Sequence, residues 1–314
     1  SIGYCRYPDA GADAETLLKK ADLAMYQAKQ QGRNRAIAYH ADFDAGVNQR
    51  LHLVSALRDG LQRDELCLAL QPVFDRDGTA VGLEALLRWQ HPERGLVAPE
   101  HFIGVCEDSG LIVLLGRWVL NEAARHHALL AASGLGHLRI AVNVSVAQFQ
   151  QSLYEDVRNA METHALPQGV LELELTESVI MVAPEAAIAT MRRIDALGVS
   201  IAVDDFGTGY SSLAYLKRLP IDRLKIDRSF VGDLGRDADD EAICTSIIQL
   251  AHSLGLTTVA EGVETAQQRE WLHARGCDEM QGFLLGAPLP FEQTLQALLA
   301  AGAAQSTDAS RVSG

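Results

Sequence analysis

From Leu66 onward, segments with the pattern of β-strands alternate with segments long enough to be helices. The strand-like runs lie at about 66–73, 80–88, 138–144, 170–176, 199–204, 222–227, 257–261 and 279–284. Helix-length segments between them include 115–132, 147–165, 184–197, 237–254 and 266–275. Eight β units in about 240 residues have the size of a (β/α)8 barrel, which typically takes about 250. The sequence therefore predicts an α/β fold, a TIM-like (β/α)8 barrel. A doubly wound open sheet is the alternative, because periodicity alone does not separate the two.

The first connection departs from this rhythm. Only Asp75-Arg76-Asp77-Gly78-Thr79 separates the first two strand-like runs. A short turn with an Asp-Gly pair is typical of a β-hairpin, whereas a parallel crossover needs a dozen or more residues. We therefore expect the first strand to be antiparallel in an otherwise parallel barrel.

Polar residues recur at the predicted strand ends, where (β/α)8 barrels carry their active sites. In Leu171–Thr176 the leucines alternate with Glu172, Glu174 and Thr176, which would face the barrel axis. Other strands contribute Glu84 and Arg88, Asn143, Asp204 and Asp205, Lys225 and Asp227, Glu261 and Glu264, and Gln281. Alone, Asp204-Asp205-Phe206-Gly207 is better explained as a helix cap and turn. Its recurrence on other strands favours a functional site.

These carboxylates carry more negative charge than Lys225 and Arg88 can balance. A single buried glutamate is more often a paired structural group than a ligand. A converging set of carboxylates repels itself unless cations lie between its members. An oxygen-rich set with one asparagine and without Cys or His favours Mg²⁺ or Mn²⁺ over zinc. Two such ions suit an in-line phosphoryl displacement.

The composition excludes several other functions. The chain has 314 residues, and 27 basic against 41 acidic side chains give a net charge of −14. Because it also lacks a long basic block, we do not expect it to bind a nucleic acid polymer. Its five cysteines are scattered, and its histidines share no strand end. No signal peptide or membrane span is visible, so we expect a cytoplasmic location, with a membrane anchor possible in a longer parent protein.

The N-terminal segment resembles a piece of another domain. Residues 14–31 have a helical pattern that includes Ala21-Asp22-Leu23-Ala24-Met25-Tyr26-Gln27-Ala28-Lys29, and Gly32-Arg33-Asn34-Arg35 follows. This stretch resembles the C-terminal end of a GGDEF diguanylate cyclase domain. The resemblance implies a GGDEF fragment over residues 1–40, with the rest of that domain and any sensory domain upstream of this chain. We expect a linker helix over 41–63, the barrel over 64–302 and a disordered tail over 303–314.

The barrel region resembles the EAL-domain cyclic di-GMP phosphodiesterases. Its motifs, in order, are Gln71-Pro72-Val73, Glu84-Ala85-Leu86 with Leu87-Arg88-Trp89, Asn143-Val144-Ser145, Glu174-Leu175-Thr176-Glu177-Ser178, the stretch 204–212, Lys225-Ile226-Asp227, Ala260-Glu261-Gly262-Val263-Glu264 and Gln281-Gly282-Phe283. The resemblance implies a (β/α)8-like barrel with an antiparallel first strand, and a homodimer formed through this domain.

The resemblance also implies roles for individual residues. The ligands of a first metal ion would be Glu84, Asn143, Glu174 and Asp204, and those of a second would be Asp204, Asp205 and Glu261. Glu261 would act as general base, Lys225 would hold the attacking water, and Asp205 would complete the catalytic set. Substrate would contact Gln71, Leu86, Arg88 and Gln281. Glu177 and Glu264 would support the loop at 207–212.

The expected reaction is hydrolysis of cyclic di-GMP to linear pGpG with Mg²⁺ or Mn²⁺, inhibited by Ca²⁺. One alternative is a catalytically silent module that binds cyclic di-GMP, although the sequence keeps every metal-ligand residue of the family pattern. A barrel glycosidase is another alternative. It would need an acid and a base at a defined separation without metal, and Lys225 among the carboxylates argues against it.

Overall fold

The computed structural model describes residues 1–30, 32–208 and 213–312, which form two compact units, Ser1–Arg63 and Asp64–Gly314. In the first unit, β1 (Ile2–Tyr4) and β2 (Ala36–Ala38) pair in parallel beside α1 (Ala14–Gln30), and α2 (Asp42–Gln62) follows. Ala24 and Ala28 on α1 are fully buried. In the described residues of both units, no helix is both long and apolar enough to cross a membrane.

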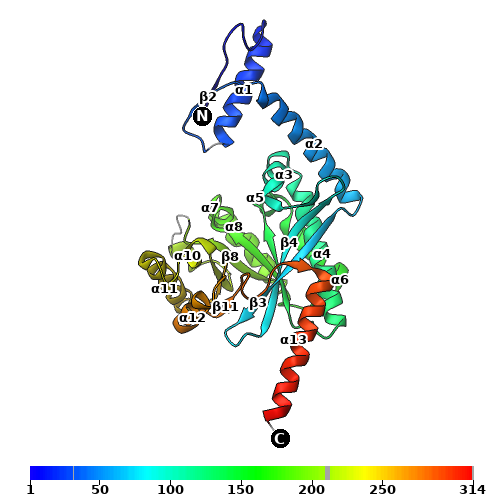
Figure 1. Ribbon diagram of the computed structural model, residues 1–314, viewed down its shortest axis with the longest axis vertical. Coiled ribbons are helices and arrows are strands. Elements are labelled where there is room, and N and C mark those ends of the chain that lie inside the picture. Colours follow the sequence, from blue (N-terminus) through cyan, green and yellow to red (C-terminus); the bar gives the residue numbers. More distant parts are fainter. Residues whose placement is uncertain (31, 209–212, 313–314) are drawn as a thin grey trace. The chain divides into compact units, whose positions relative to one another are not determined.

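The second unit is a closed barrel (Figure 1). The described residues supply its eight strands: β3 (Leu66–Asp75), β4 (Ala80–His91), β6 (Arg139–Val144), β7 (Leu171–Thr176), β8 (Ser200–Phe206), β9 (Arg223–Ile226), β10 (Thr257–Ala260) and β11 (Glu279–Met280). The pairings run in this order around the barrel, and β3 closes it by pairing with both β4 and β11. This closure confirms the predicted barrel and excludes the open sheet.

Strand direction follows from the connections. The turn after Asp75 returns the chain at once, so β3 is antiparallel to β4 and also to β11. The other neighbouring barrel strands are parallel because helices connect them. Two short strands, β5 (Gly95–Val97) and β12 (Leu289–Pro290), extend β4 and β3. The predicted antiparallel first strand is confirmed.

The helices lie outside the barrel, as Figure 1 shows. They are the short 3-10 helix η1 (Pro99–His101), α3 (Ile103–Ser109), α4 (Ile112–Ala132), α5 (Val146–Gln151), α6 (Leu153–His164), α7 (Glu177–Met181), α8 (Pro184–Asp195), α9 (Leu213–Leu216), α10 (Arg228–Gly232), α11 (Ala238–Ser253), α12 (Ala266–Arg275) and α13 (Phe291–Val312). In β7, Leu171, Leu173 and Leu175 have no exposed surface. A strand between an outer helical layer and a filled interior is buried on both faces.

Two sequence expectations differ from this structure. The last strand-like run, 279–284, shortens to Glu279–Met280 because the chain turns at Gly282, where a Cβ would lie 2.2 Å from the Val263 backbone nitrogen. The stretch 303–312, expected to be disordered, continues helix α13. Residues 313 and 314 lie outside the described part.

An ion-pair cluster fills the interior near the beginnings of the parallel strands. Arg139 donates from Nε to Glu172 Oε1 at 3.3 Å and from Nη1 to Glu279 Oε1 at 3.1 Å. Arg223 donates from Nη1 to Glu172 Oε2 at 2.5 Å. Glu172 therefore faces the barrel axis as predicted, but its charge is balanced here. Alternation thus gave the face of β7 on which Glu172 lies, but not its depth along the barrel axis, which separates it from the carboxylates around Lys225.

Candidate active site

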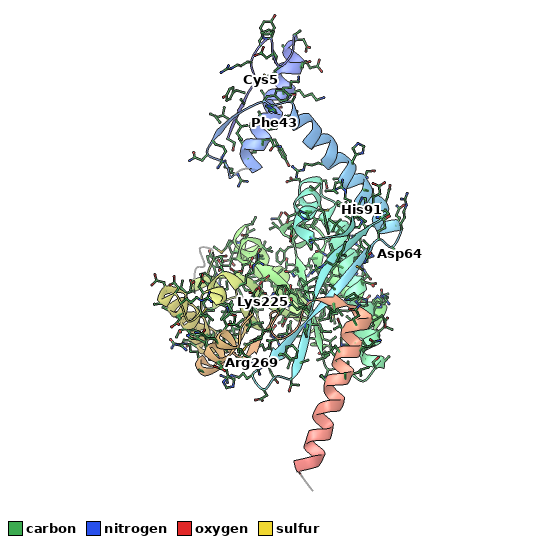
Figure 2. The ribbon with its side chains drawn as sticks, in the orientation of Figure 1. Cys5, Phe43, Asp64, His91, Lys225 and Arg269 are labelled. Carbon is green, nitrogen blue, oxygen red and sulfur yellow. The ribbon has the colours of Figure 1, made fainter. Side chains whose placement is uncertain are left out.

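Lys225 on β9 lies inside the barrel, as Figure 2 shows, and its ammonium group is surrounded by a cluster of carboxylates. Its Nζ is 2.5 Å from Glu261 Oε1, 2.8 Å from Glu174 Oε1 and 3.3 Å from Asp204 Oδ1. Glu84 Oε2 is 4.0 Å away. The side chain of Lys225 is only 2% exposed. Five strand-end residues that the sequence singled out therefore meet at one point.

A chain of amides holds Glu84 on the other side of this cluster. Asn143 donates from Nδ2 to Glu84 Oε1 at 2.8 Å, and Gln281 donates from Nε2 to Glu84 Oε2 at 2.7 Å. Gln281 also donates to Gln71 Oε1 at 3.0 Å, and Gln71 donates to the Gly286 carbonyl at 2.9 Å. The antiparallel strand β3 thus contributes Gln71 to the same site as the parallel strands.

The charges in the cluster strongly perturb one another. Burial alone would lower the pKa of Lys225, but attraction to Glu174 and Glu261 raises it well above its usual value. Burial raises the pKa of Glu174, and repulsion from Glu84 adds to the increase. Burial raises the pKa of Glu261 from 4.5 to about 8, although Lys225 opposes the increase. For Glu84, attraction to Lys225 and hydrogen bonds from Gln281 and Asn143 outweigh burial and lower the pKa.

Asp205 interacts with a second acidic group, Asp227, which also lines the cavity. The Asp205 backbone has a left-handed φ of 52°, and its N–H donates to Asp204 Oδ1 at 2.9 Å. Burial, together with repulsion from Asp204 and Asp227, raises the pKa of Asp205 to about 6. The side chain of Asp227 also accepts a hydrogen bond from the Ser229 N–H at 3.0 Å, which caps α10.

A cavity of about 390 Å³ opens onto this cluster. Its lining comes from four parts of the barrel: Gln71, Glu84 and Leu86; Asp205; Asp227 and Arg228; and Glu261, Gly262, Glu264, Gln281, Gly282 and Phe283. Arg88 is not among these residues. It is half-buried and donates from Nη1 to the neighbouring Leu87 carbonyl at 2.8 Å. Its predicted contact with a phosphate stays a prediction.

The two glutamates expected to support a loop lie in different settings. Glu177, at the start of α7, is buried and accepts a hydrogen bond from the Gly207 N–H at 3.1 Å. Glu264 is exposed and lines the cavity, and its backbone N–H donates to Gln268 Oε1 at 2.8 Å. Residues 209–212 of the loop, and with them the expected dimer contacts there, lie outside the described residues.

The family of the chain follows from comparison with known proteins. The EAL domain family matches residues 54–288, which is most of the chain. The chain belongs to the EAL domain family. The diguanylate cyclase GGDEF domain matches residues 1–35. Both resemblances found in the sequence are thereby confirmed.

Curated relatives with EAL domains come from Pseudomonas aeruginosa, among other bacteria. The bifunctional diguanylate cyclase/cyclic di-GMP phosphodiesterase MucR is 47% identical over 297 residues, which cover 94% of this chain and 43% of that protein. Cyclic di-GMP phosphodiesterase NbdA is 44% identical over 292 residues, covering 92% of this chain and 37% of that protein. The chain thus spans less than half the length of these relatives.

Solved EAL structures have the same fold. A complex described as PaMucR phosphodiesterase with c-di-GMP has a TM-score of 0.75 and 48% identity, and the match covers 77% of this chain and 99% of that one. The EAL domain of Mycobacterium smegmatis DcpA has a TM-score of 0.64 and 36% identity. That match covers 76% of this chain and 97% of the DcpA chain. The match to nearly the whole of each domain places the EAL domain of this chain in the barrel unit.

The donor set of the EAL site fits a hard divalent cation by its chemistry. Its ligating atoms would be carboxylate oxygens together with the Asn143 amide oxygen. Glu174 Oε2 is buried and has no hydrogen-bond partner among the described residues. In the same part of the chain, no three His, Cys, Asp or Glu side chains are already arranged as a metal-binding group.

Two groups of functional interest in this EAL domain were missed by sequence reasoning. Arg228 lines the cavity beside Asp227, which the motif Lys225-Ile226-Asp227 already included, but Arg228 itself was not singled out. The signal was available, because Arg228 directly follows the predicted strand 222–227 at the end where such sites lie. The ion pairs of Arg139 and Arg223 with Glu172 and Glu279 had no comparable signal in the sequence. An arginine at the start of a strand is usually a surface residue.

Proposed function

We propose that this chain hydrolyses cyclic di-GMP to linear pGpG. The observation that carries the proposal is the Lys225 cluster at an open cavity, in a chain of the EAL domain family. Relatives named as cyclic di-GMP phosphodiesterases are 47% and 44% identical to it. A 48% identical structure is described as a complex with c-di-GMP.

In the proposed reaction, water attacks one phosphodiester phosphorus and the ribose oxygen leaves. Glu261 suits the role of general base because it lines the cavity beside Lys225, and because burial raises its pKa and so makes its carboxylate form a stronger proton acceptor. Lys225, 2.5 Å from Glu261, would orient the water and offset the charge that develops on the phosphate. Gln71 and Gln281, which already form a bonded pair, would position the substrate beside Glu84 together with Leu86.

Divalent ions belong to this proposal. A first Mg²⁺ or Mn²⁺ would be held by Glu84, Asn143, Glu174 and Asp204, and a second by Asp204, Asp205 and Glu261. When bound, such ions supply a water of lowered pKa and neutralise phosphate charge. The unpartnered Glu174 Oε2 supports this assignment. The raised pKa values of Glu174 and Glu261 do so too, since burial and neighbouring carboxylates disfavour their charged forms, which a bound cation would stabilise.

The proposal extends to the organisation of the parent protein. Residues 1–40 would be the end of a GGDEF domain, residues 41–63 a linker helix, and residues 64–302 the EAL domain. Sensory domains would lie upstream in a cytoplasmic or membrane-anchored parent. A homodimer would form through the EAL domain, and Glu177, which bonds to Gly207, would link the site to that interface.

The test is incubation of the purified chain with cyclic di-GMP and Mg²⁺ or Mn²⁺, with chromatography to detect pGpG. We expect pGpG to form, to disappear with EDTA, and to return when Mn²⁺ is added. Ca²⁺ should inhibit, because it is larger and accepts looser geometry.

Glu84→Ala and Asp204→Asn should remove turnover while circular dichroism shows an intact fold. Tight binding of cyclic di-GMP without any pGpG would instead identify a silent receptor.

A further inference from the structure

Arg228 places a cationic side chain in the cavity of the candidate active site. It is the first residue of α10, directly after Asp227, and it is exposed. Five carboxylate side chains line the same cavity: Glu84, Asp205, Asp227, Glu261 and Glu264. Among the described residues, nonetheless, no hydrogen bond or ion pair engages the Arg228 guanidinium. Its charge is therefore available to a ligand.

Two backbone features fix the position of the Arg228 Cα and Cβ atoms. Asp227 caps α10 through its bond to the Ser229 N–H, which sets the direction of the turn just before Arg228. On the facing segment, Gly262 has φ +68°, and a Cβ there would lie 2.6 Å from Arg228 Cβ. The chain directly after Glu261 thus passes against Arg228. This contact places the root of the arginine side chain beside the proposed general base.

The substrate proposed above carries two phosphodiester groups, and only one is cut. The scissile group would lie against Lys225 and Glu261, which are 2.5 Å apart. The other phosphodiester also needs a counter-charge in a cavity lined by carboxylates, because two anions repel at short range. Lys225 is enclosed by its own carboxylates, and Arg88 does not line the cavity.

We infer that Arg228 binds the second, uncleaved phosphodiester of the substrate. This inference rests on the proposed function and adds a specificity-determining residue to it. A guanidinium can donate two parallel hydrogen bonds to a phosphate, which a lysine ammonium cannot do in the same geometry. Arg228 would thus select cyclic dinucleotides over compounds with a single phosphodiester.

The experiment compares Arg228→Gln and Arg228→Lys with the wild type on cyclic di-GMP. We expect Arg228→Gln to raise KM about tenfold or more, because the charge-assisted hydrogen bonds of the guanidinium to the phosphate are lost, with kcat nearly unchanged. Arg228→Lys should recover part of the loss. Arg236→Gln, an exposed arginine of the next loop that does not line the cavity, is the matched control and should leave KM unchanged.

A second substrate separates binding of the uncleaved group from damage to the site. Bis(4-nitrophenyl) phosphate has one phosphodiester, so Arg228→Gln and wild type should cleave it equally. An unchanged KM for cyclic di-GMP, or equal losses on both substrates, would overturn the inference. If the wild type binds cyclic di-GMP without cleaving it, the proposed function fails, and the dissociation constants of wild type and Arg228→Gln decide the inference. If the wild type does not bind it, both fail.

Discussion

Lys225 is surrounded by more opposite charge than it can neutralise. Three carboxylates lie within 3.3 Å of its Nζ and a fourth is 4.0 Å away. Burying an ion costs several kcal/mol unless partners compensate, and removing one partner leaves the others uncompensated. The fold therefore depends on Lys225 as much as the proposed chemistry does.

Lys225→Met tests this dependence. We expect it to lower the free energy of unfolding by about 3–5 kcal/mol in the absence of divalent ions, because the carboxylates lose their cation. Turnover of cyclic di-GMP should also be lost. Urea denaturation and pGpG formation measure the two effects. Lys217→Met, at an exposed position, is the control, and equal stability of the two variants would contradict the prediction.

The raised pKa of Glu261 should make the free energy of unfolding depend on pH. Its pKa rises from 4.5 to about 8 on folding, so the folded chain holds this proton more tightly than the unfolded chain does. Its contribution to stability is therefore fully present below about pH 4.5 and is lost as pH rises through about 8. In EDTA, Glu261→Gln should be more stable than wild type at pH 9, with a smaller difference at pH 6.

Urea unfolding at both pH values measures this difference. Glu270→Gln, on the exposed side of α12, controls for the loss of any one negative charge. Parallel pH profiles for wild type and Glu261→Gln would show that Glu261 does not carry the raised pKa.

Individual site residues were predictable to different degrees. The convergence of Glu84, Glu174, Asp204 and Glu261 on Lys225 followed from strand parity and from the common end of parallel strands. The positions of long side chains did not follow from these rules. Arg88 has the parity of Glu84 but bonds to Leu87, because a flexible arginine reaches several partners from one backbone position.

At the scale of elements, strand alternation and connection length predicted the barrel well. The short turn at 75–79 gave the antiparallel pair β3 and β4, and the helix-length segments gave the parallel strands. What the sequence did not show was depth along the barrel axis. Strand tilt and stagger set that depth, and they depend on pairing register between distant segments. For this reason, alternation predicted the face on which Glu172 lies but not its separation from the Lys225 cluster.

The ion pairs of Arg139 with Glu172 and Glu279 should contribute to the stability of the barrel but not to catalysis. Arg139→Met should destabilise the chain by about 3–5 kcal/mol, since Glu172 and Glu279 would stay buried with less compensation. KM for cyclic di-GMP should not change, because none of these residues lines the cavity. Urea denaturation and steady-state kinetics check both parts. Arg192→Met, exposed on α8, should change neither, and a shift in KM for Arg139→Met would refute the separation.

For the whole molecule, the division between Arg63 and Asp64 has a functional consequence. All the residues that line the cavity belong to the second unit. A fragment of residues 64–314 should therefore fold and form pGpG with the same KM as the full chain. Circular dichroism and kinetics measure this. A fragment that folds but has lost activity would show that residues 1–63 contribute to the site.

The barrel interior has two layers of charged residues, which differ in the balance of their positive and negative charges. Near the strand starts, Arg139 and Arg223 match Glu172 and Glu279 one for one. At the opposite rim, four acids share one lysine. A neutral replacement of one of these four acids relieves repulsion while leaving the balanced layer intact. Descendants of such a gene could lose turnover in a single step and survive as well-folded sensors of the same molecule.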